Sequence, residues 1–589
     1  MEPTRIFDLL DRYKNEYKNL QIALAGKVNG NWKTYTAKEF VETATNFSYG
    51  LLALGLNKGD KIGIITNNRP EWNFTDMGIQ MTGMINIPIY PTISEDDLRF
   101  IINDAEVKMF LVSSNEMYQK VSKIAQDFPT IQAIYTFDVV AGAKNFSEIV
   151  NLGRENPNSS KVEEIKNSIV PNDMCTILYT SGTTGNPKGV MLSHDNFLSN
   201  VLTVYDRVPA VMGKSKCLSF LPINHVYERM LTYLYQYLGL EIWYAESLET
   251  IGDNLKEVKP DVFSTVPRLL EKVYDKIVGK GKELTGVKKM LFFWALELGL
   301  KYEMHGANGW WYEFQLKLAN KIIFSKWREA LGGNVKGIVS GGAALQPRLA
   351  RVFWAANIPV LEGYGLTETS PVVGVNDCMT GRVKFGTIGP ILPKQEVKIA
   401  EDGEILVKGP NIMLGYYKRP DLTAEVIDAD GFFHTGDIGE FVDKIYLKIT
   451  DRKKEIFKTS GGKYIAPQII ENKLKESVFI EQVMVVGENK NYAAALVVPS
   501  FDFLKNWCAK KDIPFTTPHE MVKNQMVMER LMEEVETVNA KLAKFETIKK
   551  IHLLPELFSI EKGEMTPKLS LRRKQILKNN EAAIEKMYD

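Results

Sequence analysis

The chain has few cysteines, and none of them form a close pair. Its 589 residues include four cysteines, far apart in the sequence: Cys175, Cys217, Cys378 and Cys508. Structural zinc sites and dithiol redox centres need cysteines within about four residues of one another. The spacing therefore excludes such centres, and it predicts reduced thiols in a cytoplasmic protein.

Long apolar runs and a net charge are also missing. No stretch of about 18 uncharged apolar residues occurs, so the sequence predicts no transmembrane helix, and the first residues lack the apolar core of a signal peptide. The 73 Lys and Arg residues balance 72 Asp and Glu residues, which excludes the basic surface that attracts nucleic acid. We therefore expect an ordinary soluble globular protein with no nucleic-acid partner.

Short apolar runs alternate with amphipathic helical stretches through the first part of the chain. This alternation predicts an α/β fold with layered subdomains and largely parallel strands. Each run ends in Gly, Pro, Ser or Asn, which places polar residues at the carboxyl ends of strands, where open sheets bind ligands. The runs lie at 61–65, 108–112, 217–221, 262–266 and 335–339.

The pattern changes twice toward the end of the chain. From about Gly386 it becomes a series of short alternating strands such as 404–408, typical of a small β subdomain. A compact α+β segment begins after Asp451. Because the chain exceeds the length that one core usually organises, we predict a large N-terminal domain over 1–450 and a small mobile domain over 451–589.

One segment, 179–189 with the sequence YTSGTTGNPKG, follows an apolar run and combines glycines, hydroxyls and a lysine. Glycines let backbone N–H groups approach an anion, hydroxyls add donors, and Lys188 adds a positive charge. The composition fits a triphosphate-binding loop and equally a solvated polar loop. It is not a Walker A loop, because Gly189 follows the lysine, and the other candidate, 213–215, has Val208 in place of the first glycine.

A second segment, 361–371 with the sequence LEGYGLTETSP, offers an aromatic ring at Tyr364, a hydroxyl at Thr367 and a carboxylate at Glu368. These groups suit a base, a phosphate and Mg²⁺. A dinucleotide fingerprint is excluded, because Glu368 stands where its third glycine would be. Two further segments, 431–437 and 451–455, contain Asp437 and Arg452, which singly are typical of a turn and of a solvated charge run.

Together, and in this order, the four segments resemble the motifs of the adenylate-forming superfamily, which includes acyl-CoA synthetases, firefly-luciferase-like enzymes and nonribosomal peptide adenylation domains. The resemblance covers essentially the whole chain. It implies that a carboxylate attacks the α-phosphorus of ATP and releases pyrophosphate, after which a thiol replaces AMP. Mg²⁺ and positive donors offset the charge that this attack brings together.

The resemblance assigns roles position by position. It implies β- and γ-phosphate contacts from the loop residues Thr180, Ser181, Gly182, Thr183, Thr184 and Lys188. It implies the remaining nucleotide contacts as follows: the adenine wall by Gly341, Gly342 and Ala343, the stacking ring by Tyr364 with Gly365, the α-phosphate contact by Thr367, and the ribose contacts by Asp437 and Arg452. Mg²⁺ would be held by Thr180 and Glu368.

Three further assignments follow from the same resemblance. His225, in a segment that begins at Leu221, would lie beside the acyl carboxylate, although alone it is equally a core histidine. Asp451 matches the hinge of the small domain, whose face at 460–467 would line the CoA tunnel. The family's adenylation lysine would fall at Ser570, so we expect Lys568, two residues earlier, to replace it as a catalytic residue.

The chain resembles bacterial long-chain fatty-acid–CoA ligases in its length, in the sequence of 454–463 and in an aromatic insert. The expected partners are a long-chain fatty acid, ATP and CoA. The insert, 286–330, contains Trp310 and Trp311 among lysines, which predicts a helical hairpin over the core and leaves a peripheral membrane contact open. A fatty-acyl-AMP ligase serving a carrier protein and a noncatalytic regulator remain alternatives, and the oligomeric state stays open, a homodimer included.

Overall fold

The computed structural model describes residues 2–180, 187–559, 561–565 and 571–589. The chain divides into two compact units. Unit 1 contains residues 1–270, 279–397 and 407–434, and unit 2 contains residues 271–278, 398–406 and 435–589. Each unit is described by itself below.

The first sheet of unit 1 has eight strands in the order β18-β9-β8-β4-β3-β5-β6-β7. The strands from β8 to β7 run parallel, whereas β9 is antiparallel to both of its neighbours. Their bounds are β3 Lys61–Ile65, β4 Ile85–Ile89, β5 Met109–Val112, β6 Ala133–Thr136, β7 Lys144–Asn145, β8 Met174–Thr180, β9 Lys188–Ser193 and β18 Gly415–Tyr416.

The second sheet of unit 1 also has eight strands, in the order β15-β14-β13-β12-β10-β11-β1-β2, with antiparallel strands at its two edges. Their bounds are β1 Leu24–Val28, β2 Asn31–Tyr35, β10 Lys216–Ser219, β11 Glu241–Tyr244, β12 Val262–Thr265, β13 Gly337–Ser340, β14 Val360–Gly365 and β15 Val372–Val375. The predicted α/β fold is thereby confirmed, and each of the five apolar runs forms one of the parallel strands, with end shifts of a few residues.

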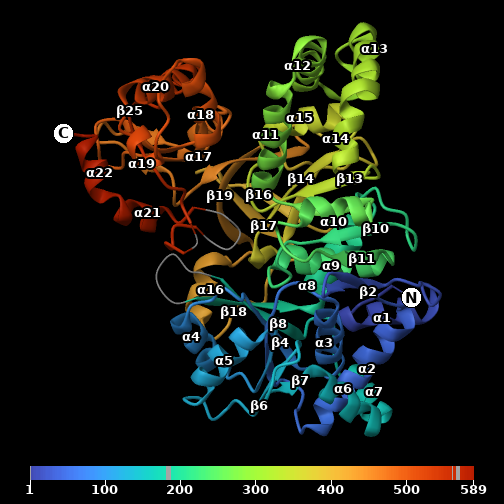
Figure 1. Cartoon of the computed structure of the whole chain (residues 1–589). Helices are drawn as coiled ribbons and strands as arrows, with labels where there is room; N and C mark the ends of the chain where they lie inside the picture. Colours follow the sequence, from blue (N-terminus) through green and yellow to red (C-terminus); the bar gives the residue numbers. More distant parts are fainter. Residues whose placement is uncertain (1, 181–186, 560, 566–570) are drawn as a thin grey trace. The chain divides into compact units, whose positions relative to one another are not determined.

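Helices cover these sheets, and α2, α3 and α6 pack together beside the first one (Figure 1). The early helices of unit 1 are η1 Ile6–Asp8, α1 Leu9–Asn15, α2 Ala37–Ala53, α3 Pro70–Met81, α4 Glu95–Ala105, α5 Asn115–Ala125, α6 Phe146–Glu155, α7 Ser159–Asn167, α8 His194–Val204, α9 Val226–Leu238 and α10 Ile251–Val258. The later ones are α11 Pro267–Glu283, whose residues 271–278 group with unit 2, α12 Gly286–Leu300, η2 Met304–Gly306, α13 Trp310–Ala319, η3 Asn320–Phe324, α14 Ser325–Ala330, α15 Pro347–Ala355, η4 Thr367–Thr369 and α16 Pro420–Val426.

A buried ion pair lies in the core of unit 1 and connects helices to the first sheet. The guanidinium of Arg229, on α9, donates to Asp76 on α3 at 2.8 Å and to the hydroxyl of Thr176 on β8 at 2.7 Å. The hydroxyl of Tyr233 donates to the second oxygen of Asp76 at 2.6 Å. Both charged side chains are completely buried, so their hydrogen bonds replace the water that each has lost.

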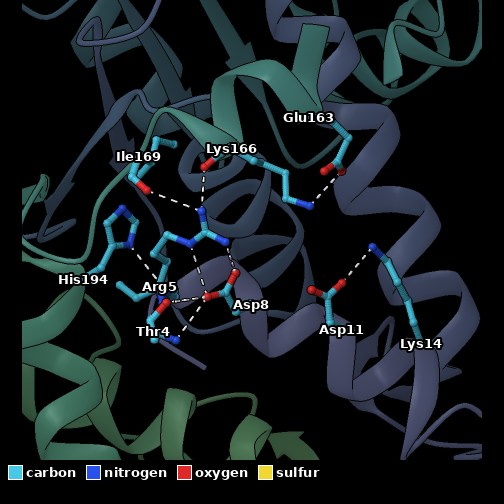
Figure 2. Close-up of polar contacts among 10 residues, drawn as sticks. Thr4, Arg5, Asp8, Asp11, Lys14, Glu163, Lys166, Ile169 and His194 are labelled. Atoms are coloured by element: carbon cyan, nitrogen blue, oxygen red, sulfur yellow. Dashed lines mark hydrogen bonds and ion pairs between the residues drawn. The ribbon is translucent and has the colours of Figure 1, made fainter. Parts of the chain in front are cut away.

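Arg5 and His194 connect the start of the chain to two helices (Figure 2). The Arg5 guanidinium donates to the carbonyl of Lys166, in the last turn of α7, at 2.6 Å, and it pairs with Asp8 at 2.9 Å. A cation is favoured at this end of a helix. Nearby, the N–H of Ile6 donates to Nδ1 of the buried His194 at 3.2 Å, a bond that only an unprotonated Nδ1 can accept.

We expect His194 to destabilise the protein at low pH. Burial lowers the pKa of His194 from 6.5 to about 4. As the pH falls below 6.5, the histidine binds a proton in the unfolded state but stays neutral in the folded state. The folded state therefore loses about 3 kcal/mol of stability in total between about pH 6.5 and pH 4. The variant His194→Gln, which keeps an acceptor for Ile6, should lose about 2 kcal/mol less than the parent between about pH 7.5 and pH 5 in urea unfolding.

The matched control for this prediction is His519→Gln, because the His519 side chain is 66% exposed. Its unfolding free energy should follow the pH curve of the parent protein. Parallel curves for His194→Gln and the parent would contradict the prediction.

Unit 2 contains most of a four-stranded sheet, β16-β17-β19-β20, and a three-stranded sheet, β23-β24-β25. Its strands are β16 Glu396–Ile399, β17 Glu404–Lys408, β19 Phe433–Val442, β20 Tyr446–Arg452, β21 Phe457–Lys458, β22 Tyr464–Ile465, β23 Ile480–Val486, β24 Ala493–Pro499 and β25 Ile548–Leu553. Its helices are α17 Pro467–Leu474, α18 Phe501–Lys510, α19 Pro518–Met521, α20 Gln525–Asn539, α21 Arg573–Asn579 and α22 Glu581–Lys586. The small β subdomain and the α+β segment expected from the sequence are both present, whereas the boundary near residue 450 stays a prediction.

Candidate active site

Thr180 and Lys188 stand opposite each other at the two ends of the predicted phosphate loop. Thr180 is the last residue of β8 and Lys188 the first of β9, and the two pair across the antiparallel ladder. The hydroxyl of Thr180 and the ammonium group of Lys188 therefore belong to neighbouring residues on two adjacent strands. The remaining loop candidates, Ser181, Gly182, Thr183 and Thr184, lie outside the described residues, as do Lys568 and Ser570.

Tyr416 connects this lysine to the second motif. Strand β18 lies next to β9, with Tyr416 opposite Val190. The ring of Tyr416 lies 5.1 Å from Nζ of Lys188, and its hydroxyl donates to Oε1 of Glu368 at 2.9 Å. Burial and the nearby Glu368 carboxylate raise the pKa of Tyr416, so the phenol stays protonated and acts as the donor. Two candidate residues far apart in sequence thus meet at one side chain.

The second motif turns sharply after β14, and Gly365 makes this turn feasible. A Cβ at Gly365 would lie 1.6 Å from the carbonyl oxygen of Pro371, so no larger residue fits. The chain then forms η4, which carries the partly buried Thr367 and Glu368. The backbone carbonyl of Glu368 accepts from the N–H of Met413 at 2.9 Å. Tyr364, also partly buried, is the second-last residue of β14, just before this turn.

The segment Gly341, Gly342 and Ala343 follows β13, the parallel neighbour of β14. Because parallel strands end at the same edge, this segment and Tyr364 share one edge of the second sheet. The N–H of Gly341 donates to the carbonyl of Thr265 at 3.2 Å, and Gly342 has a φ of 81°, which favours glycine. The role of this segment as the adenine wall stays a prediction.

Glu362 anchors this same segment, a role that the sequence reasoning missed. Its Oε1 accepts the N–H of Leu345, shortly after the glycines, at 2.8 Å. Burial raises the pKa of Glu362 to about 8, so the group is largely a neutral acid at pH 7. A carboxyl group directly after the apolar residues of a strand was the signal that could have identified it.

His225 is the N-cap residue of α9, and its ring is held in one orientation. Its Nδ1 accepts the N–H of Tyr227 at 3.2 Å, so the neutral ring carries its proton on Nε2. The hydroxyl of Tyr227 donates to the carbonyl of Val339 at 3.1 Å, and a Cβ at Gly341 would lie 3.2 Å from the Tyr227 ring. The start of α9 therefore packs against the Gly341 segment.

Glu228, which the sequence reasoning also missed, holds the start of α9 against the second sheet. The hydroxyls of Ser219 on β10 and Ser264 on β12 donate to its two oxygens at 2.6 and 2.5 Å. Burial raises the pKa of Glu228 to about 7. A Glu-Arg pair, Glu228 and Arg229, within a helical run rich in Tyr and Leu was the available signal. The two hydrogen bonds to Glu228, together with that of the Tyr227 hydroxyl to Val339, hold the start of α9, and with it His225, near the ends of β10, β12 and β13.

In unit 2, Asp437 and Arg452 form a pair. They are opposite each other on β19 and β20, and Nε of Arg452 lies 3.2 Å from a carboxylate oxygen of Asp437. Asp437 is 3% exposed, whereas the Arg452 side chain is 51% exposed. The fold therefore unites two candidates that came from separate motifs. Beside them Asp451 is buried, and burial raises its pKa to about 7.

The residues proposed for Mg²⁺ fit this ion. Among the described residues no group of three or more His, Cys, Asp and Glu side chains forms a metal cluster. Mg²⁺ generally binds one or two carboxylates together with substrate phosphates and water. Glu368 supplies such a carboxylate, held through one oxygen, and Thr180 supplies a hydroxyl oxygen at the end of β8.

A large α/β unit with nucleotide-type segments at its strand ends, followed by a small α+β unit, is the architecture of adenylate-forming enzymes. The AMP-binding enzyme family matches residues 12–417, and the AMP-binding enzyme C-terminal domain matches residues 454–589. This chain belongs to the AMP-binding enzyme family.

Curated relatives match nearly the whole chain. Fatty acyl-CoA synthetase A of Dictyostelium discoideum is 30% identical over 99% of this chain and 91% of its own. Peroxisomal long chain acyl-CoA synthetase 6 of Arabidopsis thaliana is 33% identical, with coverages of 97% and 84%. Long-chain-fatty-acid–CoA ligase FadD15 of Mycobacterium tuberculosis is 28% identical, with coverages of 95% and 93%.

Solved structures agree with the fold. The adenylation domain of a carboxylate reductase from Mycobacterium chelonae gives a TM-score of 0.77 at 20% identity, covering 99% of this chain and 91% of that one. Anthranilate CoA ligase AuaEII, in complex with anthranoyl-AMP, gives 0.74 at 16% identity, with coverages of 98% and 97%. The predicted arrangement of a large α/β domain and a small C-terminal domain is thus confirmed.

Proposed function

We propose that this chain is a long-chain fatty-acid–CoA ligase. It activates the acid with ATP to acyl-AMP, with loss of pyrophosphate, and then transfers the acyl group to CoA with loss of AMP. Family membership and the names of full-length relatives support this substrate class. The observation that carries the adenylation step is the meeting of Lys188 and Glu368 at Tyr416.

Each candidate residue has a separate role in the first step, the formation of acyl-AMP. Thr180 and Lys188 donate to the outer phosphates, Thr367 contacts the α-phosphate, and Nε2–H of His225 donates to the acyl carboxylate. Mg²⁺, held by Thr180 and Glu368, supplies compensation for the charge on the phosphates. Since every reacting group belongs to a substrate, the protein contributes mainly positioning and electrostatic stabilisation.

The remaining candidate residues are assigned to the nucleoside. Gly341, Gly342 and Ala343 form the wall beside adenine, and Tyr364 stacks on the ring, with Gly365 permitting the turn. The buried Asp437 accepts the two ribose hydroxyls, and its partner Arg452 fixes its carboxylate. A carboxylate accepting two hydroxyl hydrogen bonds is a strong and directional contact.

The small domain, over 451–589, contributes the second step. The resemblance implies a hinge at Asp451, a role for Lys568 in the first step, and a role for 460–467 on the path of CoA in the second. Rotation is useful because the first step must exclude water and the second must admit a thiol.

A panel of acids from C2 to C20, assayed with ATP and Mg²⁺ with and without CoA, tests this function. We expect pyrophosphate release that depends on acids of C12 and longer, and acyl-CoA only when CoA is present, because each buried methylene adds about 0.8 kcal/mol of binding. Pyrophosphate release without any acyl-CoA would indicate a fatty-acyl-AMP ligase instead. No release with any acid would indicate a noncatalytic regulator.

The insert 286–330 supports a membrane-surface contact. It is helical as expected, and its inner residues, Phe324 and Trp327 among them, are buried. On α13 and η3 the apolar residues at a spacing of four are exposed: Trp310 is 80% exposed, Phe314 57%, Leu318 44% and Ile322 42%. Trp311, next to Trp310, is 57% exposed. Helix α13 packs beside α12 (Figure 1). None of the described helices is long and apolar enough to cross a bilayer.

The chemistry of this face suits the lipid interface. Tryptophan favours the headgroup region, and the exposed Lys317 and Lys321 on the same elements favour anionic lipids. Long-chain acids are themselves concentrated in bilayers, so contact there would bring the enzyme to its substrate. An aromatic face with a cationic rim thus serves as a reversible anchor.

We expect the double variant Trp310→Ala/Trp311→Ala to bind vesicles of phosphatidylglycerol at least 10-fold more weakly, because the two rings would lose most of their burial in lipid. Sedimentation with vesicles measures this loss. The Tm should stay unchanged, because neither ring is buried in the fold. The control Leu248→Ala removes another exposed apolar side chain, 60% exposed, and should bind like the parent; equal binding by the tryptophan variant would refute the contact.

A further inference from the structure

Two opposite charges contact the Tyr416 side chain, one over the face of its ring and the other at its hydroxyl. Lys188 Nζ lies 5.1 Å from the centre of the ring, and the Glu368 carboxylate accepts the hydroxyl at 2.9 Å. No ion pair within 4.0 Å joins the two in the part of the chain that the structure describes. A side chain that no motif assignment includes therefore contacts both charged groups.

A direct pair between these charges would work against the reaction. If Lys188 paired with Glu368, each would neutralise the other, and phosphates and Mg²⁺ would have to break that pair before binding. A ring face attracts an ammonium group less strongly than a phosphate does. Lys188 therefore rests on Tyr416 in a state that it can leave at little cost.

The hydroxyl has a second effect, on the direction of the carboxylate. By occupying Oε1 of Glu368 it fixes the rotation of the group and leaves Oε2 for a metal ion. Outer partners of this kind orient metal ligands and raise metal affinity. A hydrogen bond from the N–H of Met413 to the backbone carbonyl of Glu368, at 2.9 Å, holds the main chain of the same residue.

Tyr416 is itself held in place by the sheet. It is 6% exposed and pairs with Val190 on β9, directly after Lys188 and Gly189. Its N–H donates to the hydroxyl of Thr423 at 2.9 Å. The next residue, Tyr417, donates its N–H to the carbonyl of Gly189 at 2.7 Å. The position of the ring is thus set by backbone contacts that do not involve its hydroxyl.

We propose that Tyr416 is a positioning residue for adenylation, whose hydroxyl orients Glu368 toward Mg²⁺ and whose ring keeps Lys188 from pairing with that carboxylate. This inference rests on the function proposed above. It predicts an effect on metal dependence rather than on folding.

The variant Tyr416→Phe removes the hydroxyl and keeps the ring. We expect the Mg²⁺ concentration for half-maximal pyrophosphate release to rise about 10-fold, the effect of losing one outer partner of a metal ligand, with a Tm within about 3 °C of the parent. The variant Tyr416→Leu removes the ring as well, and the KM for ATP should then rise too, because Lys188 is free to pair with Glu368. Both are assayed well below their Tm values.

Tyr417→Phe is the matched control, since the ring of Tyr417 lies 5.3 Å from the ammonium group of Lys418 and not beside Lys188. It should keep the parent's Mg²⁺ dependence. An unchanged Mg²⁺ dependence in both Tyr416 variants overturns the inference. The proposed function is judged separately, by Lys188→Ala and Glu368→Gln: if these lose activity while Tyr416→Phe keeps its metal dependence, only the role of Tyr416 fails.

Discussion

Glu368→Gln should slow fatty-acid-dependent pyrophosphate release by about 100- to 1,000-fold, the usual effect of removing one charged transition-state contact. The amide oxygen of glutamine can still accept the hydroxyl of Tyr416, so the local structure is retained. The negative charge that attracts Mg²⁺ is lost, however, and an amide oxygen is a weaker ligand for a hard cation. A coupled pyrophosphate assay at saturating acid measures the rate.

The control for this variant is Glu425→Gln on α16, an exposed glutamate in the same unit. It should retain the full rate, and both variants should unfold at the temperature of the parent. Part of the lost rate should return when the Mg²⁺ concentration is raised, because the ion can still bind through phosphates alone. A rate within twofold of the parent would show that Glu368 is not the metal-binding carboxylate.

Asp76→Leu should lower the free energy of unfolding of unit 1 by about 3–5 kcal/mol. The variant leaves the guanidinium of Arg229 completely buried with no carboxylate beside it, while its bonds to Thr176 and Tyr233 remain. A buried charge without a counter-ion costs far more than the loss of one hydrogen bond. Urea unfolding, followed by tryptophan fluorescence, to which the buried Trp72 contributes, measures the change.

The double variant Asp76→Leu/Arg229→Met provides the internal test. It removes both charges and fills the space with apolar atoms, so it should be more stable than Asp76→Leu alone. The surface control is Asp11→Ala, whose pair with Lys14 is 52% and 40% exposed; it should cost less than about 1 kcal/mol. If Asp76→Leu costs no more than this control, the buried pair does not stabilise unit 1.

Much of the fold was predictable because its signals are local. Buried parallel strands read as continuous apolar runs, and the five runs in the first 340 residues each became a strand. The glycines and hydroxyls of 179–189 predict a loop, and Thr180 and Lys188 are the strand residues that flank it. The aromatic insert was predicted as helical, but its sequence could not tell which rings face outward. That division appears only in the packing, with Trp327 buried and Trp310 exposed.

The missed residues share one physical cause. Glu228, Glu362 and Tyr416 each act through a partner in another segment of the chain, 9, 17 and 48 residues away. Nothing local distinguishes a glutamate that is desolvated between two serines from one that faces water. Burial, which raises the pKa of Glu228 to about 7 and that of Glu362 to about 8, is a property of the packed structure.

The sequence by itself determined the family, the order of the motifs and the chemical groups available for ATP, because these depend only on residue type and spacing along the chain. Tertiary structure decided which of those groups meet. Strand β9 runs antiparallel between β8 and β18, and this order brings Lys188 to the ring that also binds Glu368. Strand pairing between distant segments sets such meetings, and no spacing along the chain encodes them.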